Sequence, residues 1–473
     1  MTHWHQFSLA DQHGSLVNRD AEVAELVEYY LDRVARINPD VNALVHIDAE
    51  GARQRAERVG EGQLDLNMSG LAGLPSADKD LVAREGMPTG YGSVTTRGQP
   101  VAEASEPMAQ WLDAVGVLSM GKTATSEFGM SAGTESAATG PTRNPHDLAR
   151  SAGGSSGGAA AAVAAGIVPF APGSDGGGSI RIPALSCGVV GWKPSRGLVP
   201  AGTGLESAGG LTVPGLITRT ISDLAYAADF LVRGSLNWAT RAPGASGGFS
   251  KAAQHPERGL RIGMTTVSPW PSDWEIVPDA EALQAMGRAR EALADAGHTV
   301  EEFTWNPLSS YADDFITVWT ASAASLPVPE NMFDALEPLT RDLMLRGREV
   351  SGASLLLALA GLRRFETETI ERFCTFDAIL TPGLNGPAPL IGWYDKEDPE
   401  KNFAQQVQMT PWTSFVNVAG LPAISIPTLY SATGMPLGAQ LIGGPGRDAR
   451  LMGLGQQIAE RLVDATKPPA LFD

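Results

Sequence analysis

The sequence contains only two cysteines in 473 residues and no long run of large hydrophobic side chains. Cys187 and Cys374 are too far apart for a metal-ligand motif, and two cysteines do not make the disulfide framework of a small secreted domain. The uncharged stretch 157–174 consists mainly of alanine and glycine and is too short for a membrane span. The first residues carry no basic segment followed by an apolar one, so we expect no secretion signal and a cytoplasmic protein.

Basic charge and metal-binding motifs are also scarce. The chain has 35 lysines and arginines against 53 aspartates and glutamates, a formal net charge of −18. This surplus of negative charge repels phosphate backbones and anionic lipid surfaces, which argues against nucleic acid and membranes as partners. The seven histidines are scattered, and neither H-E-x-x-H nor C-x-x-C occurs, so we expect no bound metal and no cofactor.

Hydrophobic periodicity predicts alternating helices and strands. Apolar residues recur every three or four positions over residues 23–37, as on one face of an amphipathic helix. We also predict a helix over residues 278–296 and strands over residues 115–120, 167–171, 260–265 and 298–303. This alternation indicates the α/β class. We expect one domain over residues 1–473, with N-terminal helices in residues 1–65 and a helical cap or pocket wall in roughly residues 305–365.

Residues 116–123 match G-x-x-x-x-G-K-[ST], the P-loop pattern of nucleotide-binding proteins. A P-loop follows a strand and wraps phosphates with flexible backbone. Here the positions between the two glycines are themselves an apolar strand, which leaves no loop for a phosphate. We therefore favour a strand that ends at a glycine turn over a nucleotide-binding site.

Residues 153–157 match G-x-S-x-G, the nucleophile elbow of α/β-hydrolases. Asp223 and His298 follow Ser155 in the chain order that such a triad needs. The elbow also requires an apolar strand directly before it, whereas residues 143–150 are polar and contain a proline. His298 follows a glycine and has the sequence context of a turn residue. We therefore do not favour a Ser-Asp-His triad.

Two glycine-rich segments each contain a serine with glycine neighbours. Residues 153–158 read GGSSGG and include Ser155, and residues 173–183 read GSDGGGSIRIP and include Ser179. Glycine clusters at two places let backbone N–H groups face one small volume without intervening side chains, as an oxyanion hole requires. The candidates for these donors are the amides of Gly176, Gly177, Gly178 and Ser179.

These segments resemble those of the amidase signature family, whose pattern runs GGSSGG, then small residues, then G-[TS]-D-x-G-G-S-[IV]-R-x-P. The resemblance extends backward through LPSADKD (74–80), TGYGS (89–93), GKT (121–123) and GPTRNP (140–145). It extends forward through CGVVGWKPSRG (187–197) and NVAGLPA (417–423), so it covers most of the chain and accounts for the P-loop pattern. It implies the family fold, a large mixed central β-sheet covered by helices on both faces.

The resemblance implies a catalytic triad of Lys79, Ser155 and Ser179, with a cis peptide bond directly before Ser155. Ser179 would attack the acyl carbon, Ser155 would relay the proton, and Lys79 would act as the base. A lysine base at neutral pH needs a pKa well below the ordinary value of about 10.4, which burial can produce. From the local sequence alone, an ion pair of Lys79 with Asp78 or Asp80 is an alternative.

Residues around the nucleophile receive supporting roles. We assign Asp175 and Arg181 to a pair that fixes the nucleophile loop. Two positions depart from the family pattern. Ser174 stands where threonine is common and keeps the hydroxyl, and Gly176 stands where a larger residue often precedes Gly-Gly-Ser. We expect this second departure to loosen the oxyanion loop.

The resemblance says less about the substrate. It places Gly129, Met130 and Ser174 near the acyl carbon as substrate-binding residues, and it makes residues 309–352 and 405–415 candidates for the leaving-group side. Apolar side chains of these segments favour an apolar or aromatic substrate: Met130, Met409, Trp412 and Phe415.

We therefore predict an amidase that hydrolyses the C–N bond of a small linear amide through an acyl-enzyme on Ser179. Esters and carbamates are further candidate substrates, because their transition states are also tetrahedral. The family also includes the glutaminase subunit of a transfer-RNA amidotransferase, which would need a partner subunit, and this alternative stays open. A homodimer is a candidate assembly of the chain.

Overall fold

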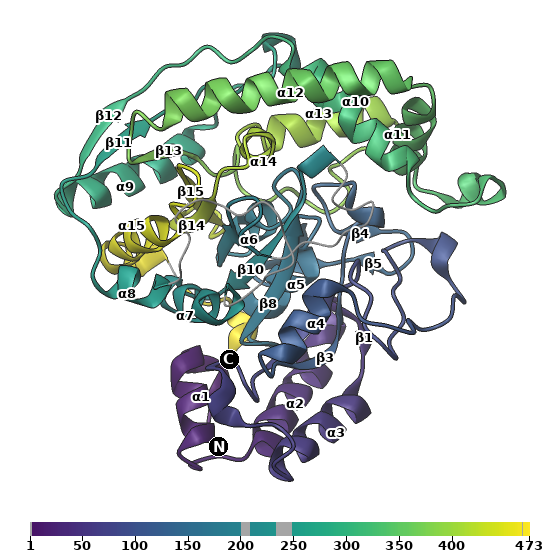
Figure 1. Cartoon of the computed structure of the whole chain (residues 1–473), viewed down its shortest axis with the longest axis vertical. Coiled ribbons are helices and arrows are strands. Elements are labelled where there is room, and N and C mark those ends of the chain that lie inside the picture. The colour runs from purple at the N-terminus through teal and green to yellow at the C-terminus, as the bar shows by residue number, and fades with distance from the viewer. Residues whose placement is uncertain (1, 200–208, 233–247, 466) are drawn as a thin grey trace.

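The computed structural model describes residues 2–199, 209–232, 248–465 and 467–473. An eight-stranded mixed sheet runs through the molecule and is flanked by helices (Figure 1). Its strand order is β12–β11–β13–β15–β14–β9–β10–β8, in which β11 is parallel to β12 and β13 and the other pairs are antiparallel. The strands are β8 (Phe170–Asp175), β9 (Val190–Lys193), β10 (Val213–Thr218), β11 (Arg261–Met264), β12 (Thr299–Glu302), β13 (Ala378–Pro382), β14 (Ala423–Tyr430) and β15 (Pro436–Gly443). The predicted α/β class and large mixed sheet are confirmed.

The N-terminal part of the chain forms the lower lobe of the view in Figure 1. Its helices are α1 (Leu9–Val17), α2 (Val23–Val41), α3 (Ala49–Gly60) and α4 (Pro107–Ala114), and β1 (Leu44–Ile47), β3 (Leu118–Thr123) and β2 (Pro75–Lys79) form a three-stranded sheet in that order. β2 contacts β8 of the large sheet, and Ser76 Oγ donates to the Phe170 carbonyl at 3.0 Å. This contact brings the end of β2 beside the end of β8.

The remaining helices fall into two groups. Around the sheet lie α5 (Gly157–Ala164), α6 (Arg181–Ser186), α7 (Ile221–Leu231), α8 (Phe249–Gln254), α9 (Ala280–Asp295) and α15 (Asp448–Arg461). Across the top of Figure 1 lie α10 (Tyr311–Ala324), α11 (Pro338–Arg348), α12 (Gly352–Phe373), α13 (Pro399–Met409) and α14 (Ser414–Val418). Four short strands form two ribbons: β4 (Glu135–Ser136) with β5 (Gly140–Pro141), and β6 (Arg143–Asn144) with β7 (Asp147–Ser151).

Helices α6 and α15 cover opposite faces of the sheet. A Cβ built on Gly191 would contact Ser425 Oγ and a side chain of α6, whereas a Cβ built on Gly455 of α15 would contact Ile426 Cδ1. Because neighbouring residues of a strand point to opposite faces, Ser425 and Ile426 mark the two sides of β14. The prediction of helices on both faces is therefore confirmed.

Most predicted elements are present with shifted ends. The helices predicted over residues 23–37 and 278–296 are α2 and α9, and the strands predicted over residues 260–265 and 298–303 are β11 and β12. The strands predicted over residues 115–120 and 167–171 begin and end later, as β3 and β8. In both cases the first predicted residues form a turn, and polar residues that are buried in the structure extend the strand.

The P-loop pattern lies mainly in strand β3. The strand continues through Gly121, Lys122 and Thr123, so the prediction that it ends at a glycine turn is wrong. Lys122 is fully buried, and its Nζ donates to the Val82 carbonyl and lies 3.9 Å from Asp80 Oδ1. A lysine held in this way does not reach a phosphate, so the segment supports the sheet instead.

The residues of the alternative Ser-Asp-His triad have other partners. His298 is buried, where Nδ1 accepts from the Leu260 amide at 3.2 Å and Nε2 lies 2.9 Å from Gln457 Oε1. Asp223 accepts from the Leu9 amide at 2.7 Å. Both side chains therefore complete hydrogen bonds between packed elements rather than a triad with Ser155.

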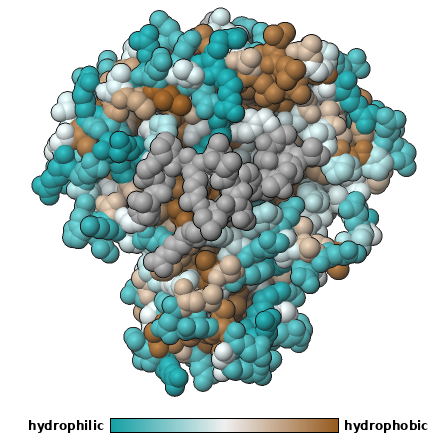
Figure 2. Space-filling view, in the orientation of Figure 1, coloured by the Kyte–Doolittle hydropathy of each residue, from teal (hydrophilic) through white to brown (hydrophobic). Residues whose placement is uncertain are grey.

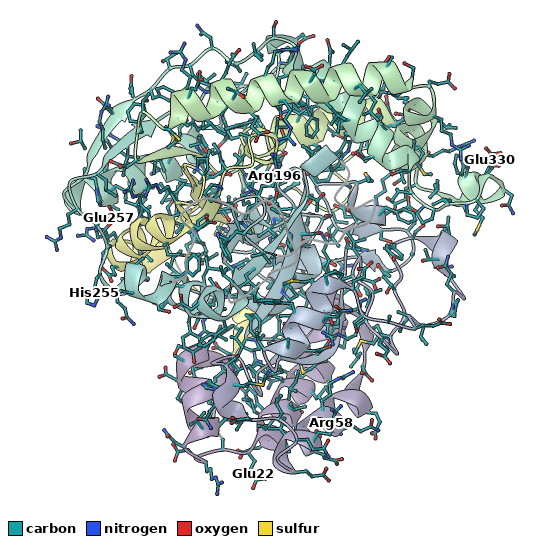
Figure 3. The ribbon with its side chains drawn as sticks, in the orientation of Figure 1. Glu22, Arg58, Arg196, His255, Glu257 and Glu330 are labelled. Carbon is teal, nitrogen blue, oxygen red and sulfur yellow. The ribbon has the colours of Figure 1, made fainter. Side chains whose placement is uncertain are left out.

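Arg196 connects two helices of the upper group. Its Nη2 donates to the carbonyls of Asn417 and Val418 in α14 at 2.7 Å each, and its Nη1 pairs with Glu366 of α12 at 3.0 Å. Figure 3 shows the labelled Arg196 in the middle of the view, beneath α12. Hydrophilic side chains cover most of the periphery of this face, and an apolar patch lies over α12 (Figure 2). Arg196 thus holds α14 in place next to the centre of the molecule.

Candidate active site

Lys79 is the last residue of β2, and its ammonium group is buried beside two serines. Nζ lies 2.8 Å from Ser155 Oγ and 3.1 Å from Ser174 Oγ, and the residue is 1% exposed. Burial lowers the pKa of Lys79 to about 7, while the carboxylate of Asp175 acts in the opposite direction. Lys79 can therefore lose its proton near neutral pH while it contacts Ser155.

The acidic sequence neighbours of Lys79 have other partners. Asp78 pairs with Arg84 at 2.6 Å. Asp80 accepts hydrogen bonds from the Gly90 amide at 3.0 and 3.1 Å. Within the described part of the chain, no ion pair joins either carboxylate to Lys79. The alternative of a lysine paired with its neighbours is therefore wrong, because adjacent residues of a strand point to opposite faces and Lys79 lies on the face opposite Asp78.

Ser155 lies directly before the turn that leads into α5. The peptide bond between Gly154 and Ser155 is cis, which confirms the prediction for this position. Ser155 is 2% exposed, and a Cβ built on Gly129 would lie 3.4 Å from Ser155 Oγ. Because Gly129 has no side chain, the hydroxyl of Ser155 keeps access to the space in front of it.

Ser179 lies in the loop between β8 and α6 and borders the same cavity as Lys79 and Ser155. The carboxylate of Asp175 organises this loop, because it accepts from the amides of Gly178 at 2.8 Å and Ile180 at 3.1 Å. The Gly178 N–H is therefore occupied, and the prediction that it contributes to an oxyanion hole is wrong in this structure. The other candidate donors are the amides of Gly176, Gly177 and Ser179.

Asp175 and Arg181 form the predicted pair, at 2.8 Å, with both side chains fully buried. Burial alone would raise the pKa of Asp175, but the guanidinium of Arg181, with Lys193 and Asn417, holds it well below its usual range. Arg181 also donates to three oxygens near α14 and in β15: the Thr413 carbonyl at 3.0 Å, Gln440 Oε1 at 2.6 Å and Asn417 Oδ1 at 2.6 Å. The nucleophile loop is thus fixed to the C-terminal half of the chain.

The nucleophile loop is held on both sides of Gly176. On one side of this glycine, Asp175 holds the loop through its carboxylate. On the other side, Thr413 Oγ1 donates to the Gly177 carbonyl at 2.6 Å. Contacts distant in the sequence thus restrain the residues around Gly176, and the effect of this glycine on the looseness of the loop stays a prediction.

A cavity of about 350 Å³ opens in front of these residues, a volume typical of a small-molecule site. The predicted substrate-binding residues Gly129, Met130 and Ser174 all line it. The segment 309–352, predicted for the leaving-group side, also lines the cavity through Trp319, Ser322 and residues 326–329, and which end of the substrate it faces stays a prediction. The other apolar residues of the wall were not identified from the sequence: Leu81, Val82, Tyr91, Phe128 and Leu211. Their separation along the chain left no local pattern that could reveal them.

The segment 405–415 does not line this cavity. Met409 is 7% exposed, and Trp412 and Phe415 are fully buried in the core. The Phe415 ring packs 5.7 Å from that of Trp305. The prediction that this segment faces the leaving group is therefore not supported, because its apolar side chains belong to the hydrophobic core.

Other site types find little support in the described residues. No group of three or more histidine, cysteine, aspartate or glutamate side chains there is placed to hold a metal ion. None of the helices that the structure describes combines the length and hydrophobicity needed to cross a membrane.

The family model named Amidase matches residues 25–452 of the chain. The chain belongs to the amidase signature family. Its relatives include "Putative amidase AmiC" of Mycobacterium leprae, which is 33% identical over 446 residues that cover 92% of this chain and 91% of the relative.

Two solved structures of similar enzymes support the same assignment. A 6-aminohexanoate cyclic dimer hydrolase, solved with its substrate, aligns with a TM-score of 0.90 and 29% identity over 100% of both chains. A bacterial aryl acylamidase of the amidase signature family aligns with a TM-score of 0.83 and 25% identity over 98% of each chain. In this amidase, the cavity presents the hydroxyls of Ser155 and Ser179 beside a lysine of lowered pKa, and none of the described residues that line it is a histidine.

Proposed function

We propose that this amidase hydrolyses the C–N bond of a small, linear, apolar or aromatic amide through an acyl-enzyme on Ser179. The contact that carries the proposal is the one between Lys79 Nζ and Ser155 Oγ, 2.8 Å long, beside a cavity that Ser179 also borders. A lysine whose pKa is about 7 is half deprotonated at neutral pH and can act as a general base.

In the acylation step, neutral Lys79 accepts the proton of Ser155, and Ser155 accepts the proton of Ser179 as that oxygen attacks the acyl carbon. The negative charge that develops on the carbonyl oxygen is stabilised by the amides of Gly176, Gly177 and Ser179. Ser155 then donates its proton to the departing amine and recovers one from Lys79. The amine leaves and Ser179 carries the acyl group.

In the deacylation step, water takes the place of the amine. Ser155 accepts a proton from the water, and Lys79 accepts one from Ser155, so that the hydroxide attacks the ester carbonyl. The same amides hold the second oxyanion. The products are a carboxylic acid and the free Ser179 hydroxyl, and the proton returns to Ser179 through Ser155.

The walls of the cavity favour a neutral, apolar substrate. Aromatic and aliphatic side chains, including Tyr91, Phe128 and Trp319, make most of its surface. Esters and carbamates present the same carbonyl to the nucleophile, so we expect side activity on both. A glutaminase subunit is not favoured, because glutamine carries a charged and polar end that this apolar cavity does not match.

The test is hydrolysis of an aryl acylamide, a primary amide, an aryl ester and an aryl carbamate by the wild type and by Ser179→Ala. We expect the variant to lose at least about 10³-fold in turnover of every substrate. The exposed Ser222 of α7 offers a matched control, and Ser222→Ala should keep wild-type turnover. Mass spectrometry of the quenched wild type should find the acyl group on Ser179. Full turnover by Ser179→Ala, with the label on Ser155, would contradict the proposal.

A further inference from the structure

Gly176 lines the cavity three positions before Ser179, at the point where the nucleophile loop faces α10. Its φ angle lies outside the left-handed region, so the backbone accepts any residue here. Gly178 in the same loop differs, because its φ of 132° favours glycine. The feature that distinguishes Gly176 is therefore the space beside it rather than its backbone.

That space is bounded by two side chains. A Cβ built on Gly176 would lie 2.9 Å from Thr212 Oγ1 and 3.4 Å from the nearest ring atom of Trp319. Trp319 is held in place because its ring stacks on Phe315 at 5.6 Å. Any side chain at position 176 would thus project into the gap between the nucleophile loop and α10 and reduce the width of the cavity there.

The catalytic geometry of the proposed function indicates which part of the substrate enters the gap between the nucleophile loop and α10. The leaving nitrogen must approach Ser155, which donates its proton, and Ser155 lies against Gly129. The carbonyl oxygen must approach the backbone amides of the nucleophile loop. The remaining substituent of the carbonyl carbon is the acyl chain, and we place it against the wall that Gly176 and Trp319 form, which adjoins the amides of the nucleophile loop.

The chemistry of this wall is apolar. The cavity lining includes the apolar side chains of Trp319, Leu211, Leu326 and Val328. Thr212 and Ser322 add two hydroxyl groups. The ionisable residues of the cavity lining come from elsewhere: Asp78 and Lys79 from β2, and Glu106 from the residue before α4. An uncharged acyl group is therefore the one that this wall can accommodate.

We infer that Gly176 and Trp319 set the size limit of the acyl group, and that the missing side chain at position 176 admits a bulky, aromatic acyl group. This inference rests on the proposed function, and it names the substrate class for the same site. Aromatic rings pack favourably against a tryptophan ring, either stacked or edge to face, so a benzoyl or phenylpropionyl group fits the gap better than an acetyl group.

The experiment compares 4-nitroanilides of acetic, benzoic and 3-phenylpropionic acid, so that only the acyl group varies. For Gly176→Ala, we expect the ratio of kcat/KM for the aromatic acyl groups over acetyl to fall by roughly tenfold, the usual effect of one methyl group in a tight pocket. Trp319→Ala should raise the size limit of the acyl group, so that a naphthoyl anilide reacts faster than with the wild type. The double variant should regain the ratio that Gly176→Ala loses, because the second change restores the width.

Gly287 of α9 supplies the matched control, since a Cβ there meets no atom within 4 Å, and Gly287→Ala should leave the ratio unchanged. An unchanged ratio in both Gly176→Ala and Trp319→Ala would overturn the inference. So would a change that follows the size of the amine, tested with acetyl amides of small and large amines. A wild type that hydrolyses none of these amides would refute the proposed function instead. Calorimetric binding of benzoate and acetate to the same variants would then decide the size limit separately.

Discussion

Lys79 Nζ lies 2.8 Å from Ser155 Oγ in a site where neither residue is more than 2% exposed. Exclusion of water from this contact has two consequences. It disfavours the charged form of the lysine, which lowers its pKa to about 7, and it leaves the serine hydroxyl as a direct partner for the neutral amine. The same burial therefore produces the base and orients it.

This relationship predicts the pH dependence of the reaction. Because neutral Lys79 is the base, kcat/KM should rise about tenfold per pH unit below pH 7 and level off above it. A pH profile of kcat/KM between pH 5 and 10 with the aryl acylamide measures the midpoint of this rise, the pH at which kcat/KM is half its plateau value. The control is Lys193 of β9, which is also buried with a pKa lowered to about 7 but does not line the cavity. Lys193→Met should keep the midpoint, and a midpoint that moves with this variant would contradict the assignment of the base.

A second prediction concerns stability. The pKa of Lys79 in the folded state, about 7, lies below its ordinary value of 10.5, so the folded state disfavours the proton. The cost is absent above pH 10.5, grows as the pH falls from 10.5 to 7, and is complete below 7, where it is on the order of 5 kcal/mol. Lys79→Met should thus be more stable than the wild type at pH 6 and gain little at pH 10. Urea unfolding at both pH values checks this, and a difference that does not change with pH would contradict it.

A third prediction concerns the nucleophile loop. A Cβ on Gly178 would lie 2.6 Å from Thr413 Oγ1 and 2.7 Å from Ile182 Cδ1, at a φ of 132°. Gly178→Ala should therefore displace Ser179 and lower kcat/KM by about 100-fold, since small misplacements in a catalytic site have effects of this size. Steady-state kinetics on the aryl acylamide measures the loss.

The control for that variant is Gly434, in the turn between β14 and β15. Its φ is also positive, at 80°, but a Cβ there meets no atom within 4 Å. Gly434→Ala should cost about 1 kcal/mol of unfolding free energy through its backbone alone and leave kcat/KM unchanged. Equal activity of the two variants would show that the loop tolerates displacement.

The fold shows where local patterns suffice and where they fail. The helix predicted over residues 23–37 follows from its apolar periodicity, and the structure extends it past Pro39 to Val41. The predicted strand over residues 115–120 ends before β3 does, since Lys122 and Thr123 are polar yet buried in the strand. Their burial depends on partners from other segments, such as Val82, which no local pattern contains.

The sequence by itself determined the family, the fold class and the residues of the two glycine-rich segments, because these depend on residue types at short spacing. Only the tertiary structure decided which partners those residues have. Asp175 occupies the Gly178 amide, and Arg181 ties the loop to Asn417 from the far end of the chain. The sequence suggested a pocket wall around Trp319, but only the structure placed this side chain opposite Gly176. Contacts between distant segments arise when the whole chain packs into a dense interior, and the spacing of residues along the sequence does not predict which segments meet there.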